Sequence, residues 1–136
     1  MQVYNKNDPC MICLDALITT EVCFAFSCNH WCCLPCLVNI NKCPLCHVKI
    51  DYHDLRPIGN SYQIFTRNWD GTTGCMQVNE NTNGEDLGNY YMLKYNLSVR
   101  PRFLMAGRQL VLDKQMKDYG IKQESTIHVV FGLKGD

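Results

Sequence analysis

The sequence lacks any feature that would place the chain in or on a membrane. No apolar run approaches the roughly 20 residues that cross a bilayer. Residues 1–9 are polar and include Lys6 and Asp8, where a secretory signal would have an apolar core. The 136 residues have a formal net charge of zero, so no basic surface for nucleic acid or an anionic membrane is indicated. We expect a cytoplasmic or nuclear protein with no nucleic-acid and no membrane partner.

Cysteine is nearly absent from the second half of the chain. Nine of the ten cysteines precede residue 47, and only Cys75 follows. In a reducing compartment such dense cysteine pairs are typical of metal ligands rather than disulfides. The first half is also too short to bury a large apolar core without such a staple. We therefore expect a metal-stabilised module at residues 1–50, a linker at 51–61 that contains Pro57 and Gly59, and an independent domain at 62–136.

Eight residues of the first module have the spacing of metal ligands. A Cys-x2-Cys pair comes first, a Cys-x-His-x2-Cys-x2-Cys group follows after fourteen residues, and a second Cys-x2-Cys pair follows after six more. These residues are Cys10, Cys13, Cys28, His30, Cys33, Cys36, Cys43 and Cys46. They are enough for two zinc ions with closed tetrahedral coordination, which makes the metal structural. Spacing alone leaves consecutive and interleaved sites both open.

Three cysteines stand outside this series, namely Cys23, Cys32 and Cys75. Cys32 could replace its neighbour Cys33 as a ligand, but Cys33 forms a Cys-x2-Cys pair with Cys36. We expect the three to be buried small hydrophobes or inert thiols, because no nearby base marks one as a nucleophile. No catalytic residue is expected on the chain.

The ligand series resembles the RING finger family, in the version with histidine as the fourth ligand. The resemblance implies two interleaved zinc sites, one held by Cys10, Cys13, Cys33 and Cys36 and the other by Cys28, His30, Cys43 and Cys46. It also implies recruitment of a ubiquitin-conjugating enzyme through a shallow apolar groove made by two zinc loops and a short helix. The matching positions are Ile12 in the first loop, Ile40 on the helix after Cys36, Pro44 in the second loop, Leu45 beside it, and His47.

Two of these positions depart from the family pattern. Many members have tryptophan at the position of Ile40, and active ligases often have arginine at the position of His47. An imidazole can donate a hydrogen bond but lacks the five-donor fork of a guanidinium, and Lys49 is the nearest substitute. The alternative for Ile12 and Ile40 is that they pack inside the module.

The second domain has an α+β pattern. Residues 62–67 alternate as a strand does, Asp70-Gly71 predicts a tight turn, and Cys75, Met76 and Val78 predict the returning strand. A helix is expected from about residue 85 to 95, with Asn83 as its cap. Buried strands are expected at 102–105 and 126–131, so one helix should cover a mixed sheet.

Four segments of this domain resemble ubiquitin: residues 63–65, 102–110, 118–121 and 124–130. The resemblance covers residues 62–136 and implies a β-grasp fold, with Thr66 and Gly84 in place of buried aliphatic residues at some cost in stability. It implies a core of Ile64, Met76, Val78, Leu87, Tyr91, Phe103, Leu110, Ile121, Ile127 and Val129. It also implies a recognition patch of Trp69, Leu104, His128 and Val130, against the alternative of scattered surface apolar residues.

The tail departs from ubiquitin, because the residues at 133–136 are Leu-Lys-Gly-Asp rather than a pair of glycines. Conjugation of this domain to targets is therefore not expected. The sequence predicts a RING-type ubiquitin ligase that holds two zinc ions, recruits a conjugating enzyme and ubiquitin, forms no covalent intermediate, and uses its ubiquitin-like domain to contact ubiquitin-binding proteins. The alternatives are a non-catalytic adaptor or decoy of the ubiquitin pathway, and the precursor of a ubiquitin-like modifier.

Overall fold

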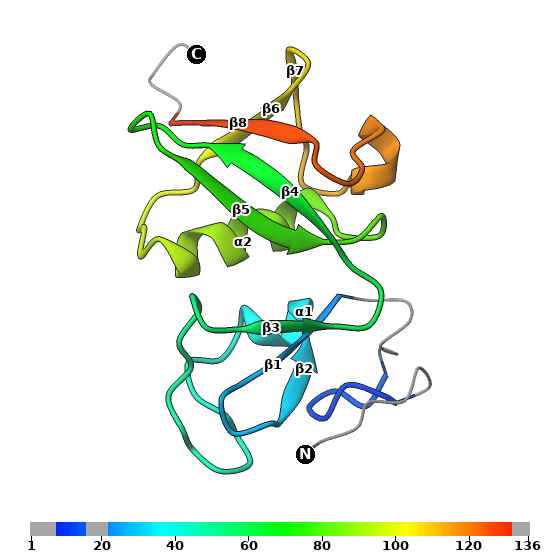
Figure 1. Ribbon diagram of the computed structural model, residues 1–136, viewed down its shortest axis with the longest axis vertical. Coiled ribbons are helices and arrows are strands. Elements are labelled where there is room, and N and C mark those ends of the chain that lie inside the picture. The colour runs from blue at the N-terminus through cyan, green and yellow to red at the C-terminus, as the bar shows by residue number, and fades with distance from the viewer. Residues whose placement is uncertain (1–7, 16–21, 132–136) are drawn as a thin grey trace. The chain divides into compact units, whose positions relative to one another are not determined.

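The computed structural model describes residues 8–15 and 22–131 of the chain. The chain divides into two compact units, Met1–Ser61 and Tyr62–Asp136, each with its own sheet (Figure 1). Within the described residues, no helix is long and apolar enough to cross a membrane. The departure of the tail at residues 133–136 falls outside the described residues.

The first unit is a small antiparallel sheet with a single helical turn. Its strands β1 (Cys23–Ala25), β2 (Trp31–Cys33) and β3 (Arg56–Ile58) lie in the order β2-β1-β3, and α1 (Leu34–Leu37) follows β2 directly. Pro35 stands in the first turn of α1, where its missing N–H is not needed. The apolar core is small, with Val22, Phe24, Trp31, Leu34 and Leu37 among its buried side chains. So small a core is consistent with a unit that needs further cross-links.

The segment expected to be a linker contains a strand of the first unit. Arg56 pairs with Ala25 and Ile58 with Cys23, so β3 forms the edge of the first sheet. Pro57 fits there because an edge strand has one side on which no N–H is required. The linker expectation is therefore wrong for residues 56–58, since proline and glycine content alone does not separate an edge strand from a connector.

The second unit is a five-stranded mixed sheet with one long helix across one face (Figure 1). In chain order its elements are β4 (Tyr62–Arg67), β5 (Thr73–Val78), α2 (Gly84–Lys94), β6 (Arg102–Met105), β7 (Arg108–Gln109), the 3-10 helix η1 (Met116–Tyr119) and β8 (Thr126–Val130). The strand order is β5-β4-β8-β6-β7, with β4 and β8 parallel and the other pairs antiparallel. All ten residues predicted for the core are buried.

The hairpin turn and the helix cap of the second unit form where the sequence predicts them. The β4–β5 turn has Gly71 at φ 89° and a hydrogen bond of 2.8 Å from Asn68 N–H to the Thr72 carbonyl. Asn83 caps α2, since its Oδ1 accepts a hydrogen bond of 2.8 Å from Asp86 N–H. Strand β7 and helix η1 were not predicted, because each is too short to show a periodic pattern.

The two residues expected to weaken the core have specific roles in it. Thr66 is fully buried, but its hydroxyl donates to Asn68 Oδ1 at 3.0 Å, so the polar group is satisfied. A Cβ at position 84 would lie 2.5 Å from the carbonyl oxygen of Val111, so Gly84 permits a close backbone contact. The cost in stability expected at both positions stays a prediction, but each residue also makes a contact that an aliphatic side chain would not allow.

Candidate metal centres and binding surfaces

The first candidate metal centre is a group of four sulfur atoms from Cys10, Cys13, Cys33 and Cys36. The four atoms lie within 4.8 Å of one another. Cys10 Sγ is 3.8 Å from Cys36 Sγ, and Cys13 Sγ is 3.9 Å from Cys33 Sγ. A tetrahedral ion with metal–sulfur bonds of about 2.3 Å separates its ligands by about 3.8 Å. The four sulfurs therefore have the separations of a tetrahedral metal site.

Backbone N–H groups surround one sulfur of this first centre. Cys10 Sγ lies 3.3 Å from the amide nitrogen of Ile12 and 3.4 Å from those of Cys13 and Cys33. The donors come from the loop after Cys10 and from the end of β2, so the local fold aims them at the sulfur. Such donors stabilise a thiolate and orient it toward a metal.

The second candidate centre consists of Cys28, His30, Cys43 and Cys46, whose ligand atoms also lie within 4.8 Å of one another. His30 Nδ1 is 3.3 Å from both Cys28 Sγ and Cys43 Sγ. Tetrahedral bonds of about 2.3 Å to sulfur and about 2.0–2.1 Å to nitrogen place such atoms about 3.5 Å apart. Three sulfurs and one imidazole nitrogen thus converge as the ligands of one ion would.

The thiol pKa values of the two centres show why positive charge is needed there. Burial raises the pKa of Cys28 and that of Cys36 to about 11. At the exposed Cys46, a hydrogen bond from the backbone N–H of Val48 lowers the pKa to about 7. A cation at each centre would offset the desolvation and mutual repulsion of the thiolates gathered there. The donor atoms and their spacing fit a tetrahedral, thiolate-binding metal ion at each centre.

The grouping in the structure is interleaved, so the alternative of two consecutive sites does not hold. Cys33 belongs to the first centre, whereas the adjacent Cys32 is fully buried outside both. Burial also raises the pKa of the Cys32 thiol. Cys23 is likewise fully buried, whereas Cys75 is exposed on β5, so the expectation of a buried small hydrophobe holds for Cys23 and that of an inert thiol stays a prediction for Cys75. The Cys75 carbonyl accepts a hydrogen bond of 2.7 Å from Lys94 Nζ.

Three of the five residues expected to bind a conjugating enzyme meet at one hollow. Ile40, Pro44 and His47 line a cavity of about 720 Å³, together with Val38, Asn39, Asn41 and Lys42. Ile12 and Leu45 do not line it, although Leu45 is 52% exposed. The hollow is therefore lined by the segment after α1 and by the loop that carries Cys43 and Cys46 of the second centre.

The residue expected on the short helix lies beyond its end. Helix α1 stops at Leu37, and the Ile40 carbonyl accepts a hydrogen bond of 2.7 Å from the Tyr52 hydroxyl. Ile40 and Ile12 are both half-buried, so neither is fully packed inside the unit. His47 has φ 69° and its N–H donates to the Cys43 carbonyl at 2.7 Å, which fixes the backbone after the last ligand.

Three residues of the expected recognition patch share the outer face of the second sheet. Leu104 on β6 pairs with His128 on β8, and Val130 lies two residues further along β8. Between them Val129 points inward and is buried, as period-two alternation requires. The structure therefore places Leu104, His128 and Val130 together on one face.

Trp69, the fourth expected patch residue, belongs to a cluster of aromatic side chains. Its ring centroid lies 5.2 Å from that of Phe131, 6.2 Å from Tyr95 and 6.3 Å from Tyr91, all edge to face. The indole is 44% exposed. Sequence reasoning missed Tyr95, although its spacing of four residues from Tyr91 on the helix signals a shared side.

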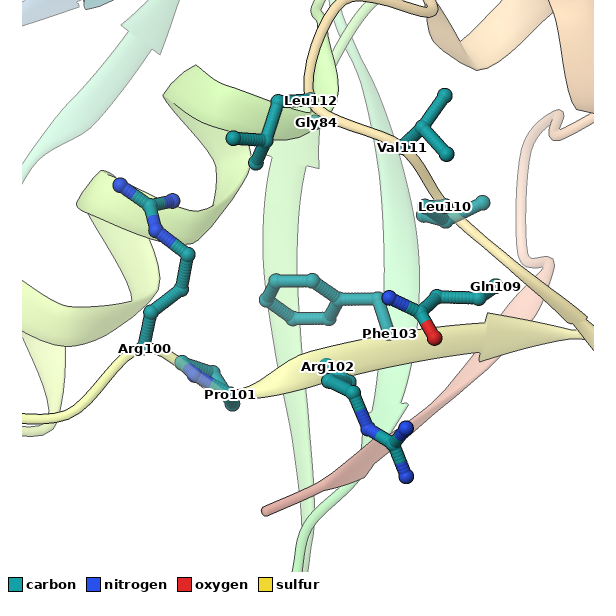
Figure 2. A pocket seen from close by; sticks show the side chains of 9 residues that line it. All are labelled: Gly84, Arg100, Pro101, Arg102, Phe103, Gln109, Leu110, Val111 and Leu112. Atoms are coloured by element: carbon teal, nitrogen blue, oxygen red, sulfur yellow. The ribbon is translucent and has the colours of Figure 1, made fainter. Parts of the chain in front are cut away.

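A smaller cavity of about 340 Å³ lies between the start of α2 and strand β6 (Figure 2). In Figure 2, Phe103 points from β6 toward the helix, while Arg102 leaves the strand on the other side. Arg100 donates to Asn89 Oδ1 at 2.6 Å and to the Glu85 carbonyl at 3.3 Å, so its guanidinium is held by the helix. The residues that line this cavity mainly join the helix to the sheet.

Comparison with protein families agrees with the architecture of the second unit. One helix on a mixed five-stranded sheet, with the first and last strands parallel at its centre, is the β-grasp arrangement. The model of the ubiquitin family matches residues 64–134, which is more than half of the chain. This chain belongs to the ubiquitin family.

Proposed function

We propose that this protein is a RING-type ubiquitin ligase, which recruits a ubiquitin-conjugating enzyme and orients it for ubiquitin transfer. The observation that carries the proposal is the interleaved pairing of eight ligands in one unit of a chain whose other unit is ubiquitin-like. Its compartment would be the cytoplasm or the nucleus, where thiols stay reduced.

Zinc is the metal that we propose for both centres, because sets of cysteine with one histidine are its common structural ligands. The ion would supply a tetrahedral cross-link with no open position for substrate. Four residues of this chain complete each centre, so the metal would stabilise the small first unit rather than take part in chemistry.

The hollow around Ile40, Pro44 and His47 is the proposed docking surface for the conjugating enzyme. Pro44 and His47 are carried by the loop of the second centre, so metal binding would hold them in place. Ile12 and Leu45 would extend the contact from outside the hollow. No residue of this chain would form a covalent bond, since the thioester and the attacking amine belong to the partners and the gain is one of orientation.

The ubiquitin-like unit would bind partners through Leu104, His128 and Val130, with the Trp69 cluster as a further contact. Aromatic anchors such as tryptophan are enriched at binding hot spots. The partners that this surface suits are conjugating enzymes and other proteins that bind ubiquitin.

The direct test combines the protein with activating enzyme, a panel of conjugating enzymes, ubiquitin and ATP. Formation of ubiquitin chains that requires this protein and its metal would support the ligase. If a conjugating enzyme binds but no member of the panel is stimulated, the adaptor is the better description. His47, in place of the arginine of active ligases, is the observation that favours this second candidate.

A further inference from the structure

The turn between β1 and β2 carries two ligands of the second centre. Two backbone hydrogen bonds close it, from Phe26 N–H to the His30 carbonyl at 2.8 Å and from Asn29 N–H to the Phe26 carbonyl at 2.9 Å. Asn29 has φ 69°, a left-handed conformation that asparagine tolerates better than most side chains. Cys28 and His30 flank this residue, so a change in its backbone would move both ligand atoms.

A side chain from outside the ligand series reaches this turn. Arg56 lies on β3 opposite Ala25. Its Nη2 atom is 2.9 Å from the Phe26 carbonyl oxygen and 2.6 Å from Asn29 Oδ1. This nitrogen has two N–H bonds, so it can donate one to each acceptor. The guanidinium therefore ties the backbone of the turn to the side chain at its tip.

The other ligands are held in a different way. At the first centre, the donors to Cys10 Sγ are amides of the ligand segments themselves. Cys43 is fixed by hydrogen bonds of 2.8 Å to the Val48 carbonyl and 2.7 Å from His47 N–H. The contacts of Arg56 thus bear on the Cys28 and His30 half of one centre.

We propose that Arg56 is a positioning residue for the second metal centre, which holds Cys28 Sγ and His30 Nδ1 ready for the ion. Groups that hydrogen-bond metal ligands directly typically change metal affinity about 10–100-fold when they are removed. Arg56 is exposed and acts through Phe26 and Asn29 rather than on the ligands, so its effect should lie at or below the low end of that range. The inference rests on the proposed metal centres but is independent of ligase activity. Strand β3 would then do more than extend the sheet, because it positions the Arg56 guanidinium at the β1–β2 turn.

The test is cobalt(II) binding to the full-length protein with competition by a chelator. Cobalt bound by four thiolates and cobalt bound by three thiolates and an imidazole differ in their visible absorption, so the two centres can be followed separately. Arg56→Met keeps the aliphatic stem and removes both hydrogen bonds. We expect it to weaken the second centre by up to about tenfold and leave the first centre unchanged. Arg56→Lys should recover part of the affinity, because an ammonium retains donors.

The matched control is Arg67→Met, which removes an exposed arginine from the end of β4 in the second unit. Asn29→Gly removes one acceptor while keeping the left-handed turn accessible, so Arg56→Met should cost less affinity in that background. Equal affinities in Arg56→Met and the parent protein would overturn the proposal, as would equal weakening of both centres. A parent protein that binds no cobalt would instead refute the metal centres themselves.

Discussion

Asn68 accepts hydrogen bonds from two buried hydroxyl groups, and its replacement should cost far more than its size suggests. Its Oδ1 lies 2.6 Å from the Tyr91 hydroxyl and 3.0 Å from that of Thr66. Both donors belong to fully buried side chains. Asn68→Ala removes the shared acceptor and leaves two buried donors without it. At about 1–2 kcal/mol for each, we expect a loss of about 3 kcal/mol from the second unit.

A double-mutant cycle separates this effect from general damage to the turn. Tyr91→Phe removes one donor and leaves Asn68 Oδ1 still bonded to Thr66, so it should cost about 1 kcal/mol by itself. In the Tyr91→Phe background, Asn68→Ala leaves only the Thr66 hydroxyl without its acceptor. The substitution should therefore cost about 1–2 kcal/mol less there than in the parent protein.

Native-state hydrogen exchange of the β4 and β8 amides in the full chain measures this stability without unfolding the first unit. Gln77→Ala on β5 is a suitable control, since its side chain is only half-buried. Strictly additive losses for Asn68→Ala and Tyr91→Phe would refute the shared acceptor as the source of the effect.

Five further predictions concern metal and partners. Elemental analysis should find two zinc ions per chain, and one or none would contradict the two centres. A chelator should abolish amide protection in the first unit but not in the second, because the metal cross-links only the first. Ile40→Ala should reduce the affinity for the conjugating enzyme about tenfold, because it removes a half-buried apolar contact of the hollow. The control Val48→Ala changes an exposed residue outside the hollow and should leave the affinity unchanged. An unchanged affinity in Ile40→Ala would mean that the hollow is not the docking surface. His47→Arg should speed ubiquitin discharge with unchanged zinc content, since a guanidinium can bond two partners at once; no change would show that orientation is achieved elsewhere. Leu104→Ala and Val130→Ala should each weaken calorimetric binding of the full chain to the conjugating enzyme, and affinities equal to that of the first unit alone would exclude cooperation between the units.

The sequence by itself determined the features that depend on neighbours along the chain. The eight ligands are recognisable because a turn with two cysteines has a short, fixed spacing. The hairpin follows from Asp70-Gly71, and the start of α2 follows from Asn83, since a turn and a cap are local structures. The alternation around His128 and Val130 correctly placed both on one face of β8.

Tertiary structure decided the features that need residues far apart in sequence. Spacing left the pairing of ligands open, and the packing of the loop at Cys10 against β2 decided it, because this contact brings Cys33 to Cys10. The role of Arg56 depends on β3 pairing with β1, which a proline-containing segment did not reveal. Thr66 is accommodated in the core because Asn68 Oδ1, two residues along the chain but across the turn, accepts a hydrogen bond from its hydroxyl and from that of the distant Tyr91. In each case the controlling interaction is a contact in space, and no pattern along the chain encodes it.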